Sequence, residues 1–277
     1  MKLHFLGTAA AEGFPNMFCM CDACVEARNR GGKDIRTRSG IIINDYIKID
    51  FSADTHMQTL RDEIDLGNIK HLLVTHTHSD HLVAGDLEAR MQGFAHNINY
   101  PLEIYGNSLV LKECKRFDLE SLNNGNDYSL NLLLPFKTIK LEENMYVTPL
   151  LADHDRTELC YLYYIEIEGV TLLYGNDTGW FPEETWNWLK GRKIDIAILD
   201  CTVGMTGNNK SKNHMSVETV IHTRNKLKNI GSIHDESKVI ATHISHNSKM
   251  HHNDLENVFN SESIEVAYDS MIINYES

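Results

Sequence analysis

The sequence lacks an excess of basic residues, a short-period repeat and any low-complexity tract. Its 26 Lys and Arg residues stand against 39 Asp and Glu residues, which gives a formal net charge of -13. Because proteins bind nucleic acids mainly by neutralising phosphates with Lys and Arg, this balance argues against a long nucleic acid as the partner. A small anionic substrate stays compatible with it, since bound metal ions can reverse the local field.

The N-terminal segment MKLHFLGTAAAEG also lacks a long apolar run and contains a single lysine. It therefore has neither the features of a signal peptide nor the length of a membrane span. We expect a cytoplasmic protein with no membrane partner. In a reducing compartment, the six cysteines indicate free thiols or metal ligands rather than disulfides.

No linker interrupts the 277 residues, of which 42% are hydrophobic, so we expect one domain over residues 1–277 with a large core. Strand-like and helical segments alternate in both halves. Each half also contains a hairpin signal, at Asn44-Asp45 and at Glu168-Gly169. The pattern predicts an α/β fold of two similar halves packed face to face. It leaves the oligomeric state open, a homodimer included.

Periodicity and end signals predict where the helices lie. The expected helical ranges are about 54–64, 87–94, 108–117, 182–190 and 217–229. Pro182 is suited to a helix start, and Ser216 is suited to an N-cap. A Gly/Ala/Pro loop with three cysteines is expected after the first strand, and residues 123–136 show no clear period.

The segment LLVTHTHSDHLVAG places three histidines and an aspartate in six positions after a strand-like run. His76, His78 and Asp80 lie two residues apart, so they project to one side of an extended backbone. The two histidines can hold one metal ion, and Asp80 with the adjacent His81 can hold a second. A solvated polar loop is the alternative, but α/β proteins place their sites at such strand ends.

Two metal ions need further ligands from other strand ends. His154, Asp177 and His243 each follow or end an apolar extended run, where strand termini would converge. Each also has an ordinary interpretation: a surface histidine, a turn-forming aspartate before glycine, and a strand-end histidine. Their joint order favours the interpretation as ligands.

The order His-x-His-x-Asp-His, then His, Asp and His, resembles the metallo-β-lactamase superfamily over nearly the whole chain. The resemblance implies a four-layer αβ/βα sandwich with a dinuclear site between two sheets. It implies that the first metal is bound by His76, His78 and His154. It implies that the second is bound by Asp80, His81 and His243, and that Asp177 bridges both.

The resemblance also matches Asp50, which ends YIKID, to an aspartate that orients metal ligands from behind; a turn-capping carboxylate is the alternative. Two divalent ions held by imidazoles and carboxylates lower the pKa of a shared water, so a bridging hydroxide is available near neutral pH. Zinc suits this ligand set, and manganese and iron stay open.

A second metal signature lies in NMFCMCDACVEAR, which contains Cys19, Cys21 and Cys24. Three thiolates at this spacing can share one tetrahedral structural zinc, which needs a fourth ligand. His246 is the candidate, and Cys201 is the reserve. Such a zinc would brace the strand end that carries the catalytic ligands; reduced loop thiols are the alternative.

The cysteine-rich loop after the LGTAA opening narrows the resemblance. It is similar to the phosphodiesterases of the carbon-phosphorus lyase pathway, which open a phosphoribosyl cyclic phosphate. It is more distantly similar to the pyrroloquinoline-quinone biosynthesis B protein. Ribonuclease Z shares the di-metal ligands but typically lacks the cysteines and adds a tRNA-grasping arm, and no basic insertion of that kind is present.

His214 stands just ahead of the expected helix at 217–229. In phosphodiesterases of the superfamily a histidine at this place protonates the leaving oxygen, so the resemblance implies that His214 is the general acid. It also implies that Asp80, besides binding a metal, is a catalytic residue. A surface histidine is the alternative for His214. Weaker candidates for phosphate contact are Lys210, Lys212, Arg36 and Arg38.

Together these features predict a di-metal hydrolase that cleaves a small phosphodiester, a cyclic one included, with zinc, manganese or iron, supported by one structural zinc. Hydrolysis of a lactone, thioester or β-lactam is the nearest alternative, because the same hydroxide can attack a carbonyl. A non-catalytic metal-dependent binding protein is the other alternative.

Overall fold

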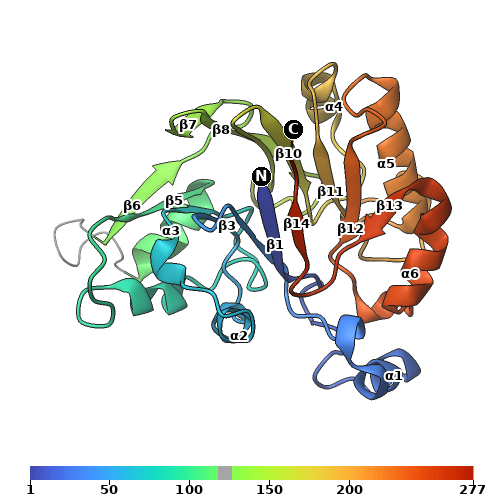
Figure 1. The fold of residues 1–277 in the computed structure, drawn as a ribbon, viewed down its shortest axis with the longest axis horizontal. Helices are drawn as coiled ribbons and strands as arrows, with labels where there is room; N and C mark the ends of the chain where they lie inside the picture. The colour runs from blue at the N-terminus through green and yellow to red at the C-terminus, as the bar shows by residue number, and fades with distance from the viewer. Residues whose placement is uncertain (118–126, 277) are drawn as a thin grey trace.

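The computed structural model describes residues 1–117 and 127–276, and within them the strands form two sheets. Each sheet has seven strands, in the orders β14-β1-β2-β3-β4-β5-β6 and β13-β12-β11-β10-β9-β8-β7. The N-terminal half builds the first sheet and the C-terminal half the second, except that β14 returns to pair with β1. Figure 1 shows the two termini close together, where the ammonium of Met1 donates to the carbonyl of Tyr275.

The outer face of the first sheet packs against helical segments of the N-terminal half, such as residues 84–90 and 108–116. Its strands are β1 (Lys2–Gly7), β2 (Gly40–Ile43), β3 (Ile47–Ile49), β4 (His71–Leu73), β5 (Leu102–Gly106), β6 (Tyr128–Leu132) and β14 (Ile272–Asn274). The helical segments of this half are α1 (Asp22–Arg30), η1 (Gly32–Asp34), α2 (Thr55–Arg61), η2 (Leu66–Asn68), η3 (Ala84–Arg90) and α3 (Ser108–Arg116). Of these, η1, η2 and η3 are 3₁₀ helices.

The second sheet is arranged in the same way. Its strands are β7 (Ile139–Glu142), β8 (Met145–Leu151), β9 (Tyr161–Ile167), β10 (Val170–Gly175), β11 (Ile196–Asp200), β12 (Lys238–Thr242) and β13 (Ile264–Val266). Its helical segments are α4 (Glu183–Leu189), α5 (Val217–Asn229), η5 (His246–Ser248), α6 (His252–Phe259) and η6 (Asn260–Glu262). Figure 1 shows α4, α5 and α6 on the outer flank of this sheet.

The apolar core lies in three layers, which follow from the alternation of strand side chains. Ile47 and Ile49 of β3 face the second sheet and pack in one cluster with Ile198 of β11. Leu72 of β4 faces the outer helices and packs with Val110 of α3. Since burial of such a side chain stabilises the fold by roughly 1.5–3 kcal/mol, a one-residue shift in register would be costly. The arrangement confirms the predicted four-layer αβ/βα sandwich.

Most of the local predictions are confirmed. The hairpin at Asn44-Asp45 has φ values of 50° and 63°, which two-residue turns between antiparallel strands require. The hairpin at Glu168-Gly169 joins β9 to β10 in the same manner. Helices α2, α3, α4 and α5 lie within the predicted ranges, whereas residues 84–90 form the 3₁₀ helix η3 where an α-helix was expected near 87–94.

Two α-helices of the described residues, apart from the short 3₁₀ helices, were not predicted. The cysteine loop continues into α1, which buries only the small side chains Ala23, Cys24 and Ala27, so its apolar period is weak. Helix α6 begins with histidine and asparagine rather than an apolar run. Of the 123–136 stretch, residues 123–126 lie outside the described residues, and β6 follows them. No helix of the described residues is both long and apolar enough to cross a bilayer.

Candidate metal centre

The predicted metal ligands follow the carboxyl ends of strands from both sheets. His76 to His81 come after β4, and His154 follows β8. Asp177 and His243 follow β10 and β12, which run parallel on either side of β11. Because parallel strands end at the same edge of a sheet, their following residues meet there. The structure thus brings together side chains that lie up to 167 positions apart in the sequence.

The first group consists of four side chains around Asp177. Nε2 of His76 lies 3.4 Å from Oδ2 of Asp177, and Nδ1 of His154 lies 3.2 Å from its Oδ1. Nδ1 of His78 lies 3.1 Å from Nε2 of His154. One ligand atom from each of these residues lies within 4.8 Å of all the others, a spacing that one cation can bridge.

The second group shares Asp177. Nε2 of His81 lies 2.9 Å from Oδ2 of Asp177 and 3.1 Å from Oδ2 of Asp80. Nε2 of His243 lies 3.8 Å from Asp80 and 3.9 Å from Asp177. The four side chains are buried, and their ligand atoms again lie within 4.8 Å of one another. Asp177 therefore belongs to both groups and could bridge two cations.

The donor set fits divalent cations, because several of its buried polar atoms have no hydrogen-bond partner. These atoms are Nε2 of His76, Nε2 of His81, Nε2 of His243 and Oδ1 of Asp177. A buried unpaired polar group costs about 1–3 kcal/mol, so four in one place call for a ligand. Imidazole and carboxylate are ligand types that zinc, manganese and iron accept.

Charge within the group shifts the pKa values as a cation site requires. Burial acts to raise the pKa of Asp177, but the nearby histidines hold it well below its usual range. Burial also acts to raise the pKa of Asp80, and His81 and His243 again lower it. Both carboxylates are therefore ionised at neutral pH and can act as ligands.

Asp50 has the orienting contact that its predicted role requires. It is fully buried, with φ at 61°, and Nδ1 of His81 donates to its Oδ2 over 2.7 Å. Its Oδ1 accepts hydrogen bonds from the N–H and hydroxyl of Thr75, at 2.8 and 2.9 Å. This contact fixes the tautomer of His81 and turns its Nε2 toward Asp177.

Asp200 is the counterpart of Asp50 in the other half, and the sequence analysis missed it. It ends β11, is fully buried, and accepts hydrogen bonds from the N–H of Met215 and the hydroxyl of Thr202, each at 2.8 Å. The Thr202 hydroxyl lies 2.8 Å from Nδ1 of His243, which leaves Nε2 for the metal site. The usable signal was an aspartate directly ending an apolar strand, as at Asp50.

A second missed residue is Asp155, whose Oδ2 lies 3.0 Å from Nε2 of His78. The contact leaves Nδ1 of His78 as the ligand atom. Its signal in the sequence was weak, because LADHD reads as an ordinary polar loop.

His214 is placed beside the shared carboxylate. Its Nδ1 lies 3.1 Å from Oδ1 of Asp177 and 3.2 Å from Oδ2 of Asp200. Burial acts to lower the pKa of His214, but the two nearby carboxylates raise it to about 11. The ring remains 30% exposed and lines the pocket.

A third grouping, which consists of Asp177, Asp200, His214 and His243, also has the spacing of a cation site. Asp200 already accepts hydrogen bonds on both oxygens, from Thr202 and Met215. We therefore interpret it as a residue that positions His214 and His243 rather than as a ligand.

The cysteine site is also assembled. Sγ atoms of Cys19, Cys21 and Cys24 and a ring nitrogen of His246 lie within 4.8 Å of one another. Sγ of Cys21 lies 3.8 Å from Nδ1 of His246, and this contact, with help from the backbone at Cys24, lowers the pKa of Cys21 to about 6. Burial raises the pKa of Cys24 to about 11. Cys201 is buried in the apolar core and belongs to no candidate metal group of the described residues.

The mouth of the centre is a cavity of about 370 Å³. Besides the ligands, its lining includes Glu12, Thr206, Ser245 and Asn247, and it contains no Lys or Arg. The basic candidates lie elsewhere. Arg36 is buried and bonded to Thr8 and to the carbonyl of Ala267, so it has a structural role.

The other basic candidates do not line the cavity either. Arg38 forms an ion pair with Asp54, at 2.8 Å. The ammonium of Lys210 lies 5.3 Å from the centre of the Trp180 ring, and Lys212 is exposed. The cavity at the metal centre is therefore lined by none of the four basic candidates.

The two sheets and the His/Asp groups that share Asp177 define an α/β protein with a candidate metal centre. The model of the β-lactamase superfamily domain matches residues 46–244. The chain therefore belongs to the β-lactamase superfamily, whose members are mostly hydrolases. No curated protein sequence matches the chain.

Solved structures show the same fold over the whole chain. A diphosphatase from the PhnP family shares 21% identity with a TM-score of 0.72, over 99% of this chain and 98% of that one. Zn²⁺-bound PqqB from Methylobacterium extorquens shares 19% identity with a TM-score of 0.74, over 99% and 100%. The short form of human tRNase Z shares 17% identity with a TM-score of 0.69, over 100% of both chains. At these identities the likeness establishes the fold alone.

Proposed function

We propose that the protein is a phosphodiesterase that uses two divalent metal ions and acts on a small phosphodiester. The observation that carries the proposal is the pair of four-residue groups that share Asp177, with Nδ1 of His214 3.1 Å from the same carboxylate. A hydrolase needs a source of nucleophile, a means to neutralise the phosphoryl charge, and an acid for the leaving group. The arrangement has a residue for each task.

His76, His78 and His154 would hold one ion, Asp80, His81 and His243 the other, and Asp177 both. When bound, two such ions lower the pKa of water and neutralise the charge that grows on phosphoryl oxygens. The chain itself sets the direction of the ligands. Asp50 holds His81, Asp155 holds His78, and Thr202 holds His243, so none of these rings can turn freely.

His214 would supply the proton to the departing alkoxide. The contacts of its Nδ1 with Asp177 and Asp200 fix the ring, which lines the pocket. In this orientation Nε2 is the atom that can reach a leaving oxygen. The adjacent Ser216 caps α5 by accepting from the N–H of Thr219, which holds the backbone that carries His214.

The size and lining of the cavity support a small substrate. Its volume of about 370 Å³ is at the low end for sites that enclose a small ligand. Without Lys or Arg in the lining, the ions would be the main cationic groups for an anionic substrate. The net charge of -13 also disfavours a long nucleic acid. Two of the solved neighbours are named a diphosphatase and a tRNase, and these names agree with the reaction class proposed here.

A structural zinc held by Cys19, Cys21, Cys24 and His246 completes the proposal. His246 begins η5, three residues after His243, so this ion would tie the N-terminal loop to the end of β12. Ser245, between the two histidines, also donates to the carboxylate of Glu12. The zinc would thereby brace one wall of the cavity.

A substrate panel tests the function. Protein loaded separately with zinc, manganese and iron, with the metals confirmed bound, is assayed on bis(p-nitrophenyl) phosphate, a cyclic phosphodiester, a lactone, a thioester and a chromogenic cephalosporin. We expect turnover of the phosphodiesters. His154→Gln should abolish it, whereas the exposed His234→Gln should leave it unchanged. Turnover of the carbonyl substrates alone, or of none, would reject the proposal.

A further inference from the structure

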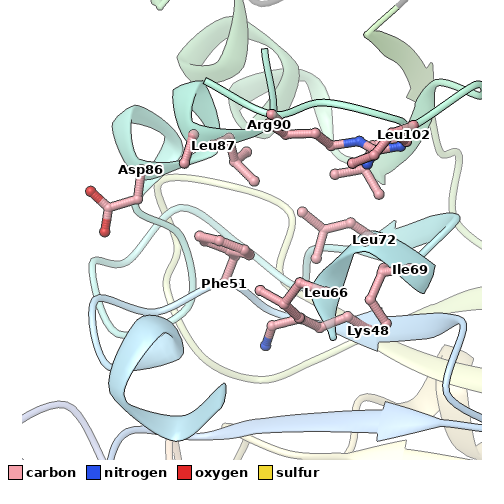
Figure 2. Close-up of a pocket in the computed structure, with 13 residues that line it drawn as sticks. Lys48, Phe51, Leu66, Ile69, Leu72, Asp86, Leu87, Arg90 and Leu102 are labelled. Carbon is pink, nitrogen blue, oxygen red and sulfur yellow. The ribbon is translucent and has the colours of Figure 1, made fainter. Parts of the chain in front are cut away.

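Two cavities of the described residues differ in the kind of group that they can take. The one in Figure 2, of about 190 Å³ between the first sheet and η3, has a mostly apolar wall. Lys48 contributes to that wall, but its Nζ is buried beside Gly40 and has no hydrogen-bond partner. The lining shares no residue with the cavity of the metal centre. Selection between phosphoryl groups of different charge therefore rests with the side chains at the metal centre.

Glu12 is the acidic residue of that lining outside the two ligand groups. It lies in the loop after β1, in a turn that the N–H of Gly13 closes on the carbonyl of Ala10 over 3.0 Å. The N–H of Ala10 in turn donates over 3.2 Å to the carbonyl of Ile244, which lies just after β12. The backbone thus holds Glu12 next to the segment that carries His243.

The side chain of Glu12 is held through one of its oxygens. The hydroxyl of Ser245 donates to Oε1, and Nε2 of His246 lies 3.6 Å from the same atom. Within residues 1–117 and 127–276, Oε2 takes part in no hydrogen bond or ion pair. The side chain is 24% exposed, so its charge is partly shielded from bulk water and lies at the wall of the cavity.

Among the described residues that line the cavity, no Lys or Arg compensates this charge. Arg38 reaches the same loop, where it donates to the carbonyl of Ala11, but its guanidinium is paired with Asp54 at 2.8 Å. Zinc at the cysteine site would not compensate Glu12 either, because three thiolate charges exceed the two charges of the ion. Glu12 therefore adds negative charge at the mouth of the metal centre.

A fixed negative charge acts on a bound anion in proportion to the charge of that anion. In free energy it disfavours a dianion about twice as strongly as a monoanion. A phosphodiester has one negative charge, whereas a phosphomonoester has close to two above about pH 7, because its second pKa is roughly 6. We infer that Glu12 determines specificity, and that it makes the metal centre select phosphodiesters over phosphomonoesters. The inference rests on the proposed phosphodiesterase function and adds the charge of the substrate.

Binding of two anions that cannot be hydrolysed tests the inference without turnover. Dimethylphosphinate has one negative charge and methylphosphonate has two at about pH 9, and neither contains a P–O–C bond. Calorimetry measures their dissociation constants on the zinc-loaded protein. In Glu12→Gln the affinity for methylphosphonate should rise at least about threefold more than that for dimethylphosphinate, and this excess should shrink from about 0.05 to about 0.5 M salt. An equal change for both anions, or no change, would overturn the inference.

Two control variants separate charge from structure. Glu12→Asp keeps the charge and should keep the ratio of the two affinities within about twofold of that in the unmodified protein. Glu143→Gln alters the net charge equally, but this exposed residue precedes β8, at the end opposite His154, so the ratio should stay unchanged. A ratio that changes in Glu12→Asp as much as in Glu12→Gln would overturn the inference, because a lost structural contact would then account for both.

The role of Glu12 and the proposed function fail separately. Turnover of phosphodiesters, with an unchanged binding ratio in Glu12→Gln, would reject the role of Glu12 and keep the phosphodiesterase. A changed binding ratio without turnover of any phosphodiester would reject the phosphodiesterase and keep the charge selection at Glu12.

Discussion

The carboxylate of Asp50 and Nδ1 of His81 are 2.7 Å apart, and both side chains are fully excluded from solvent. The bond leaves Nε2 of His81 facing Asp80 and Asp177. Asp50 directly follows β3, and His81 lies in the loop after β4. Asp200 and Thr202 do the same for His243 in the other half of the chain. The metal centre is thus held from both sheets by buried carboxylates.

Replacing Asp50 by Asn should lower the affinity for the metal ion at His81 by about 10–100-fold, the usual effect of losing an orienting carboxylate. Competition with a chromogenic chelator measures the affinity. Asp45→Asn, at an exposed aspartate paired with Lys2, is the matched control and should have no effect. Equal affinity in Asp50→Asn and the unmodified protein would contradict the assigned role.

Replacing Cys21 by Ser should lower the metal content from about three ions to about two, because a tetrahedral zinc site loses one of its thiolates. Elemental analysis of purified protein gives the count. Cys201→Ser is the control: this cysteine is buried in the core, and its loss should leave all ions in place. A lower zinc content in Cys201→Ser would instead favour Cys201 as a ligand.

Replacing His214 by Gln should slow phosphodiesters with poor leaving groups by about 10²–10⁴-fold, since they need protonation of the departing oxygen. Hydrolysis of nitrophenyl esters should be slowed far less, because nitrophenolate leaves without needing a proton. The rates of methyl and nitrophenyl esters of the same phosphate make the comparison. His222→Gln, on α5 against Trp180, should change neither rate. Equal slowing of both esters by His214→Gln would remove its role as an acid.

Replacing Ser216 by Ala should lower the free energy of unfolding by about 1 kcal/mol, the usual contribution of a helix N-cap. The side chain accepts from the N–H of Thr219 over 3.1 Å, and its hydroxyl donates to the carbonyl of Asn208. Urea unfolding measures the change. Ser261→Ala, at an exposed position, should stay within about 0.5 kcal/mol. A neutral Ser216→Ala would show that the cap does not hold α5.

Replacing Lys48 by Met should make the protein more stable below pH 8, because burial lowers the pKa of this amine from 10.5 to about 8. Below that value the folded state holds a buried charge. As pH rises from 8 to 10.5 the folded state loses its proton while the unfolded state keeps it, so the unmodified protein gains stability and the advantage of the variant falls. Urea unfolding at about pH 7 and about pH 9.5 tests this; a constant difference would contradict it.

Much of the fold could be predicted because its signals are local. Asn44-Asp45 and Glu168-Gly169 adopt the left-handed conformations that their hairpins require. Ser216 caps its helix, and apolar strands end where polar ligands begin. Helix α1 could not be predicted because its buried residues are small. Asp200 was missed because its one signal, an aspartate that ends an apolar strand, fits a turn-capping carboxylate equally well.

The sequence by itself determined the residue types of the candidate metal ligands, their order along the chain and the strand ends that carry them, because these depend on residue type and on periods of a few residues. Only the tertiary structure decided that His76 and His243 converge on the shared Asp177, and that Asp50 and Asp200 support the centre from opposite sheets. The same holds for Lys48, which alternation places in an apolar layer that exists only once the helices cover the sheet. Such contacts depend on how two sheets pack, and no local pattern encodes that packing.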